Sequence, residues 1–185
     1  MKWTRWTRFA WDLRRFAPAY PAVDPRYQFR AAAPADEKSV RAVVLSAFTL
    51  DSNWAFLANL LKSQLEAVLD TLFLGEKSEK ADPEGLRPFC LVVTHGTRII
   101  GASVLTARRD ADNHLLTGPS ILVEYHNRGL ATALLAHSLQ ALKEAGVQTA
   151  YGRTIDSGLT AQFIYSKFGS TRIVPPEDAP DQVAS

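Results

Sequence analysis

The amino-acid sequence predicts a single α/β domain in which a mixed central sheet is flanked by helices. The chain has 185 residues, of which 46% are hydrophobic, and this suits one compact core that needs no disulfides. From Tyr27 onward, strand-like segments alternate with helical apolar patterns, as an α/β fold requires. The single cysteine, Cys90, and four scattered histidines provide neither a disulfide framework nor a cluster at metal-ligand spacing. We therefore expect a reduced, cytoplasmic protein without a bound metal.

The first sixteen residues stand apart in charge and in aromatic content. They contain five basic residues and Asp12, a net charge of +4, whereas the whole chain carries +2. Tryptophans recur at helical spacing, so a helix here would have an aromatic stripe and a basic back. We interpret residues 1–25 as an N-terminal arm that packs its tryptophans on the domain or on a second subunit, and its last part, residues 17–25 with three prolines, as a linker. Contact of the arm with a membrane surface or a nucleic acid stays open as an alternative.

The first half of the domain, which we place at residues 26–174, is predicted to contain two helices. A short strand at residues 27–31 precedes a helix that Pro34 and Asp36 open. Asp51 or Ser52 can cap a second, longer helix, whose apolar stripe ends near Gly75. The apolar positions of the two helices are Val40, Val43, Val44 and Ala47, and then Trp54, Leu57, Leu61, Leu65, Val68 and Leu72.

A charged loop at residues 76–88 leads into the predicted sheet. Residues 89–94 and 98–105 are apolar and β-branched, and Gly96 between them supplies the positive φ of a tight hairpin. Cys90 in the first of these strands reads as a small buried hydrophobe. Residues 114–123 are predicted to form a central strand, and the apolar face Leu130, Leu134, Leu135, Leu139 and Leu142 predicts the helix that follows, up to Gly146.

The junction between this strand and this helix is a candidate anion site. The first turn of a helix has unpaired N–H groups and a partial positive charge, and Gly129 lets a ligand approach the backbone closely. A packing or capping role for the Arg-Gly pair is the alternative reading from the residues alone.

The same junction resembles the acetyl-CoA signature of the GCN5-related N-acetyltransferase (GNAT) family, in which Gln or Arg, two residues, Gly, one residue, and Gly or Ala follow one another. His126, Gly129 and Ala131 correspond to that pattern. The resemblance implies a GNAT fold and acetyl-CoA as co-substrate. It also implies a diphosphate bound by the loop amides and a pantetheine arm paired with the preceding strand end. The residues implied at the acetyl-CoA site are Ile121, Leu122, Val123, His126, Asn127, Arg128, Gly129, Leu130, Ala131, Thr132 and Gly158.

A second resemblance lies in residues 157–169, predicted as a capped helix that ends in Gly169. The family pattern of Asn, two residues, Ala, three residues and Tyr corresponds here to Gly158, Ala161 and Tyr165. The resemblance implies that Tyr165 protonates the departing thiolate of coenzyme A. A phenol suits this role because its reference pKa of about 10 exceeds the thiol value of about 8.5. Packing of the helix on the sheet is the alternative role for Tyr165.

No general base is assigned from the sequence. Where some relatives carry a Glu, five residues before Gly158, this chain has Arg153. Asp156, His114 and Glu124 are the nearest candidates, each with an ordinary structural role as its alternative.

Family members add two strands after the tyrosine-bearing helix, whereas this chain offers one short strand at residues 171–174 and an acidic tail at residues 175–185. We therefore expect a shortened C-terminus, with an acceptor pocket that is open, or completed by the N-terminal arm or by another subunit.

These features predict an acetyl-CoA-dependent N-acetyltransferase that acts on a small-molecule or peptide amine, without a membrane span and without nucleic acid as partner. A homodimer through the arm or a sheet edge is compatible with the pattern. An inactive acetyl-CoA-binding or interaction protein of the same fold is the alternative, because the Glu and a terminal strand are missing. A nucleic-acid or membrane module built on the basic arm is a third reading.

Overall fold

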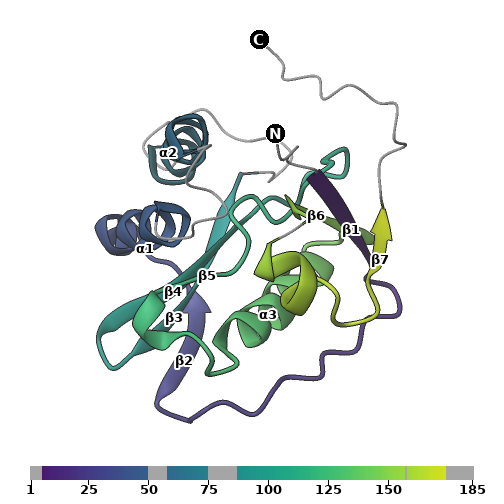
Figure 1. Cartoon of the computed structure of the whole chain (residues 1–185), viewed down its shortest axis with the longest axis horizontal. Coiled ribbons are helices and arrows are strands. Elements are labelled where there is room, and N and C mark those ends of the chain that lie inside the picture. The colour runs from purple at the N-terminus through teal and green to yellow at the C-terminus, as the bar shows by residue number, and fades with distance from the viewer. Residues whose placement is uncertain (1–5, 50–57, 75–86, 157, 174–185) are drawn as a thin grey trace.

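The protein folds around two antiparallel sheets (Figure 1). A computed structural model describes residues 6–49, 58–74, 87–156 and 158–173. The larger sheet has the order β2-β3-β4-β5, with β2 (Tyr27–Ala31), β3 (Phe89–His95), β4 (Arg98–Leu105) and β5 (Ser120–Ile121). The smaller sheet has the order β6-β1-β7, with β1 (Trp6–Asp12), β6 (Thr149–Ile155) and β7 (Thr171–Ile173). The predicted combination of sheet and helices is confirmed, and the sheet is divided between β5 and β6.

Helices cover both faces of the larger sheet. On one face lie α1 (Glu37–Thr49), entered through the 3-10 turn η1 (Pro34–Asp36), and α2 (Ala58–Leu74). On the other lies α3 (Leu130–Glu144). The alternation of β3 explains this arrangement, because Val92 packs in the cluster of α1 and α2 whereas Val93 packs in the cluster of α3. The helical faces predicted around Val40 and Leu134 are buried as expected.

The N-terminal segment is a strand, so the helix expected there is wrong. Figure 1 shows β1, in dark purple, between β6 and β7, although these two strands come from the other end of the sequence. Alternate side chains are buried, namely Thr7, Phe9 and Trp11. A helix would satisfy its hydrogen bonds internally, but here the open edges of β6 and β7 provide partners on both sides, and period-2 burial of Phe9 and Trp11 follows.

From β1 the chain crosses α3 to reach β2. Residues 17–24 have no helix or strand. Phe16 is buried against Phe168, and its carbonyl accepts a hydrogen bond from Nζ of Lys143 at 2.7 Å. Further along, Tyr20 packs on His137 of α3, with ring centroids 4.5 Å apart. The linker is thus fastened to α3.

The predicted central strand at residues 114–123 is much shorter in the structure. Only Ser120 and Ile121 pair with β4 as a strand, and Leu115 forms an isolated bridge with Leu105. Between them the backbone turns at Gly118, whose φ is +61°, and Pro119 has no N–H to donate. The hydroxyl of Thr117 accepts the N–H of Val104 at 3.0 Å in place of a ladder bond.

The helix predicted at residues 157–169 is also shorter, since the structure has the π-type turn η5 (Thr160–Ile164). Phe168 and Gly169, both with positive φ, end this segment before β7. Predictions for Asp51, Ser52, Trp54, Leu57, Gly75, residues 76–86 and the acidic tail lie outside the described residues. None of the helices in the described part of the chain has the length and apolar character of a membrane span.

Candidate functional site

The loop before α3 exposes a turn of backbone at the point where the larger sheet ends. After β5 comes the 3-10 turn η4 (Val123–Tyr125), and residues 126–129 are all exposed. Asn127 and Gly129 adopt left-handed conformations, with φ of +60° and +74°. Gly129 is the N-cap of α3, and no side chain caps it.

The backbone amides of this turn have no partner elsewhere among the described residues. His126 donates its N–H to the carbonyl of Val123, and the next bonded amide is that of Ala133, which donates to Gly129 at 3.0 Å. The N–H groups from Asn127 to Thr132 therefore remain free at the positive end of a 15-residue helix. Such a row of amides suits a diphosphate.

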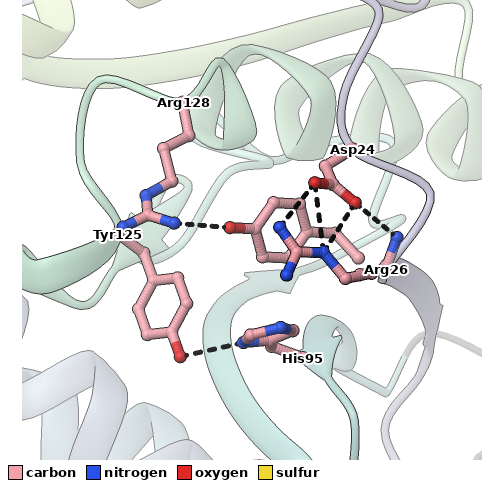
Figure 2. A network of polar contacts seen from close by, with 6 residues as sticks. Asp24, Arg26, His95, Tyr125 and Arg128 are labelled. Atoms are coloured by element: carbon pink, nitrogen blue, oxygen red, sulfur yellow. Dashed lines mark hydrogen bonds and ion pairs between the residues drawn. The ribbon is translucent and has the colours of Figure 1, made fainter.

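Side chains hold this turn from the outside (Figure 2). Arg128 donates to the hydroxyl of Tyr27 at 2.8 Å and to the carbonyl of Glu124 at 3.1 Å. Its guanidinium carbon lies 5.1 Å from the ring centroid of Tyr125, whose hydroxyl contacts Nδ1 of His95 at 3.2 Å. The turn is thereby tied to β2 and to the hairpin between β3 and β4.

His126, the departure from the usual family residue, also serves the turn itself. Its Nε2 lies 2.9 Å from the carbonyl oxygen of Ile121, so the ring donates to the strand end. The carbonyls of Leu122 and Val123 accept the N–H groups of Tyr125 and His126. A ligand that pairs with the segment from Ile121 to Val123 must share these carbonyls or bind to the N–H groups of the segment. The pairing of pantetheine with this segment stays a prediction.

Tyr165 lies just after η5 and is almost completely buried, with 1% of its surface exposed. Its ring packs edge-on against Phe9 and Trp11 of β1, with centroids 5.8 and 5.4 Å away. Burial raises the pKa of the phenol above its usual value of 10.0, so the hydroxyl keeps its proton at neutral pH. Tyr165 is thus a packing residue whose hydroxyl remains protonated.

Two glycines make room for this tyrosine. A Cβ placed on Gly118 would lie 2.7 Å from the hydroxyl oxygen, and one placed on Gly152 would lie 2.9 Å from the ring. Gly118 precedes β5 and Gly152 belongs to β6, so the hydroxyl lies where the two sheets separate. Neither glycine was predicted from the sequence, although an isolated glycine in a strand pattern signals close approach of another group.

Gly158 is explained by packing. Its N–H donates to the carbonyl of Ile155 at 3.0 Å, and an added Cβ would lie 3.1 Å from the same oxygen. This amide is therefore engaged, and a role of Gly158 toward acetyl-CoA stays a prediction.

His114, one candidate base, joins the two sheets. Its backbone N–H donates to the carbonyl of Tyr151 at 2.7 Å, and its ring Nδ1 accepts the backbone N–H of Tyr151 at 3.0 Å. The other nitrogen, Nε2, has no partner with good hydrogen-bond geometry, although the backbone of Arg108 is near enough to favour the protonated ring. Burial dominates and lowers the pKa of His114. The residue is 1% exposed, which favours a structural role.

The carboxylates considered as bases are paired with arginines. Asp156 forms an ion pair with Arg172. Glu124 is exposed and lies 2.7 Å from Arg98, and hydrogen bonds from its own amide and from Arg98 lower the pKa of its carboxyl. Arg153, at the position of the family Glu, is exposed on β6.

Cys90 is buried, and burial raises the pKa of its thiol to about 12, so it is a packing residue, as predicted. Among the described residues, no three His, Cys, Asp or Glu side chains are grouped so as to hold a metal ion.

Known proteins resemble this chain in sequence profile and in fold. The sequence profile of the acetyltransferase (GNAT) family matches residues 54–169. A GCN5-related N-acetyltransferase from Kribbella flavida is similar in structure, with a TM-score of 0.55, 14% identity, and coverage of 94% of this chain and 58% of that one. One from Sphaerobacter thermophilus has a TM-score of 0.54 and 19% identity, covering 92% and 50%.

A tandem GNAT protein from the clavulanic acid biosynthesis pathway has a TM-score of 0.57 and 14% identity, covering 95% of this chain and 55% of that one. The chain thus spans about half the length of these structures. No curated protein matches the sequence. At these identities the structures show the fold, and the profile covers well over half of the chain. The chain therefore belongs to the GNAT family of acetyltransferases.

Proposed function

We propose that this protein transfers the acetyl group of acetyl-CoA directly to the amine of a small molecule or peptide. The observation that carries the proposal is the row of exposed, unbonded amides from Asn127 to Thr132 at the start of α3. These donors suit the diphosphate of coenzyme A, because they lie at the end of the helix that is partially positive. The links of Arg128 to Tyr27 and Tyr125 support the turn in this shape without occupying its amides.

Tyr165 supplies the proton-donating group in this proposal. Acetyl-CoA brings a thioester, in which attack by the amine nitrogen forms the amide bond while the carbon–sulfur bond breaks. The hydroxyl of Tyr165 donates to the sulfur as negative charge develops there, and its raised pKa keeps it protonated until that point. The proton that the amine loses on forming the amide bond replaces the one that the phenol gives to the sulfur. In this proposal the thioester approaches the hydroxyl beside Gly118 and Gly152, where β5 and β6 belong to separate sheets.

Binding is tested by placing a charge in the amide turn without harming the helix. A Glu in the first turn of a helix is favourable for stability, but at Thr132 it would repel a diphosphate. We expect Thr132→Glu to weaken acetyl-CoA binding in calorimetry by at least about tenfold, or about 1.4 kcal/mol, relative to the uncharged control Thr132→Gln. Equal affinities of the two variants, with both folded by circular dichroism, would contradict the diphosphate site.

Transfer is tested separately with Tyr165→Phe, which keeps the ring against Phe9 and Trp11. General acid–base groups contribute about 10²–10⁴-fold to a rate. The rate of thiol release with a panel of amines should therefore decrease by about that factor, while the affinity for acetyl-CoA is unchanged. A full rate in this variant assigns Tyr165 to packing.

One observation favours an acetyl-CoA-binding protein without catalysis as the second candidate. Arg153 occupies the position of the family base, and the described carboxylates near it, Asp112 and Asp156, both pair with arginines. Acetyl-CoA binding without thiol release across the amine panel is the result that selects this candidate.

A further inference from the structure

The smaller sheet carries a second cluster of chemistry, on the face opposite to Tyr165. Directly paired residues of an antiparallel sheet share a face. Arg8 of β1 pairs with Arg153 of β6, and their neighbours on this face include Trp6 and Tyr151. We call these four residues the Arg8–Arg153 face. Phe9, Trp11 and Gly152 point to the other side, toward η5 and α3.

Each arginine of this face lies over an aromatic ring. The guanidinium carbon of Arg8 is 4.9 Å from the ring centroid of Tyr151, and that of Arg153 is 5.6 Å from the ring of Trp6. Stacking of this kind restrains a guanidinium while its N–H groups stay free to bind an oxyanion.

The charge on the face is only partly compensated. Arg153 is 45% exposed in its side chain and lies 3.4 Å from Asp112, itself 68% exposed. Its backbone N–H donates to the side-chain oxygen of Asn113 at 3.2 Å. Arg8 forms no ion pair with any carboxylate among the described residues. Two like charges placed directly opposite on a sheet repel each other, and an anion between them would relieve this repulsion.

This face lies one strand's thickness from the proposed reaction centre. Gly152 of β6 stands between Tyr151 and Arg153 in sequence, and the ring of Tyr165 approaches it from the other side, 2.9 Å from where a Cβ would be. An acceptor bound on the Arg8–Arg153 face therefore lies across β6 from the phenol. In the described part of the chain, η5 and α3 pack against the buried side of this sheet, whereas on this face Arg153 is exposed and Trp6, Arg8 and Tyr151 are partly exposed.

We propose that the Arg8–Arg153 face binds an oxyanion group of the acceptor, a carboxylate or a phosphate, so that the substrate is an anionic amine such as an amino acid or peptide. Arg153 thus replaces the general base of some relatives with a binding group. This inference rests on the proposed acetyl transfer for the role of the bound molecule, but the binding of the oxyanion can be measured without it.

The test compares ligands that differ only in the anion. Calorimetry on the full chain, without acetyl-CoA, measures the affinity for a dipeptide and for the amide of its C-terminus, and for O-phosphoethanolamine and ethanolamine. We expect the charged member of at least one pair to bind about tenfold more tightly or better, and the preferred pair identifies carboxylate or phosphate. Arg8→Gln and Arg153→Gln should each remove most of this preference, and the double variant all of it.

The control is Arg14→Gln, an exposed arginine of the same segment that pairs with Asp12 and should leave the preference intact. In thiol-release assays, the Arg8 and Arg153 variants should raise KM for the anionic acceptor and change kcat by less than about threefold, because uniform binding is lost. Equal affinity of wild-type protein for both members of both pairs overturns the inference, as does a preference that persists in the double variant. Thiol release that is absent for every amine counts against the proposed transfer, and the calorimetry then still decides the oxyanion site.

Discussion

Replacing Trp11 by Ala tests whether β1 is an integral strand of the domain. Trp11 is 1% exposed, its Nε1 donates to the carbonyl of Lys167 at 2.9 Å, and its ring packs on Tyr165 and Phe9. Truncation of a buried tryptophan costs about 3–5 kcal/mol, and the unpaired carbonyl adds about 1 kcal/mol. The expected loss of about 4–6 kcal/mol is a large part of a typical stability of about 5–15 kcal/mol.

Urea unfolding followed by far-UV circular dichroism measures this loss. The melting temperature should fall by about 8–24 °C, since about 2–4 °C corresponds to 1 kcal/mol in a protein of this size. Trp6→Ala is the matched control, because Trp6 lies on the same strand but is only partly buried on the opposite face, and its cost should stay near 1 kcal/mol or below. Equal destabilisation by the two variants would refute the placement of β1 between β6 and β7.

Three further predictions concern single side chains. Gly118→Ala brings a Cβ to 2.7 Å from the Tyr165 hydroxyl at a residue with φ of +61°. The rate of thiol release should fall by about tenfold or more, because a misplaced donor costs up to about 10²-fold. An unchanged rate would show that the position of the hydroxyl does not matter. Burial raises the pKa of the Cys90 thiol to about 12, so a thiol reagent at pH 8 should label native protein far more slowly than urea-unfolded protein, whereas equal rates would contradict its burial. Burial lowers the pKa of His114 and of His137 below 6.5. Below about pH 6.5 the unfolded state therefore binds more protons than the folded state, and the melting temperature should fall as pH drops from 7.5 to 5.5. His114→Asn should make that decline less steep, and an identical slope would refute the lowered pKa of His114.

The helices and the larger sheet were accessible from sequence because their burial follows one clear period. Val40, Val43 and Val44 mark one face of α1, and the stripe from Leu130 to Leu142 marks α3. The bounds of β2 and β4 agree with the prediction, and Gly96 has the positive φ expected for the hairpin. The amide turn before α3 was also found in this way, because its location depends only on where a strand ends and a helix begins.

The N-terminal segment shows where sequence patterns run out. Its apolar residues satisfy a helical stripe through Trp6, Ala10 and Leu13 and equally a strand alternation through Phe9 and Trp11. Only the tertiary structure decides between them, because β6 and β7 present unpaired edges that a strand can fill.

The positions of Tyr165 and Arg153 were likewise decided by the fold. The sequence indicated a phenol near the thioester and an arginine in place of a base, but not what surrounds either group. The hydroxyl of Tyr165 lies where Gly118 and Gly152 leave space for it, and Arg153 meets Arg8 only because β1 pairs with β6. Local sequence determines which backbone conformations and buried faces are favourable, whereas contacts between segments more than a hundred residues apart depend on how the sheets are assembled.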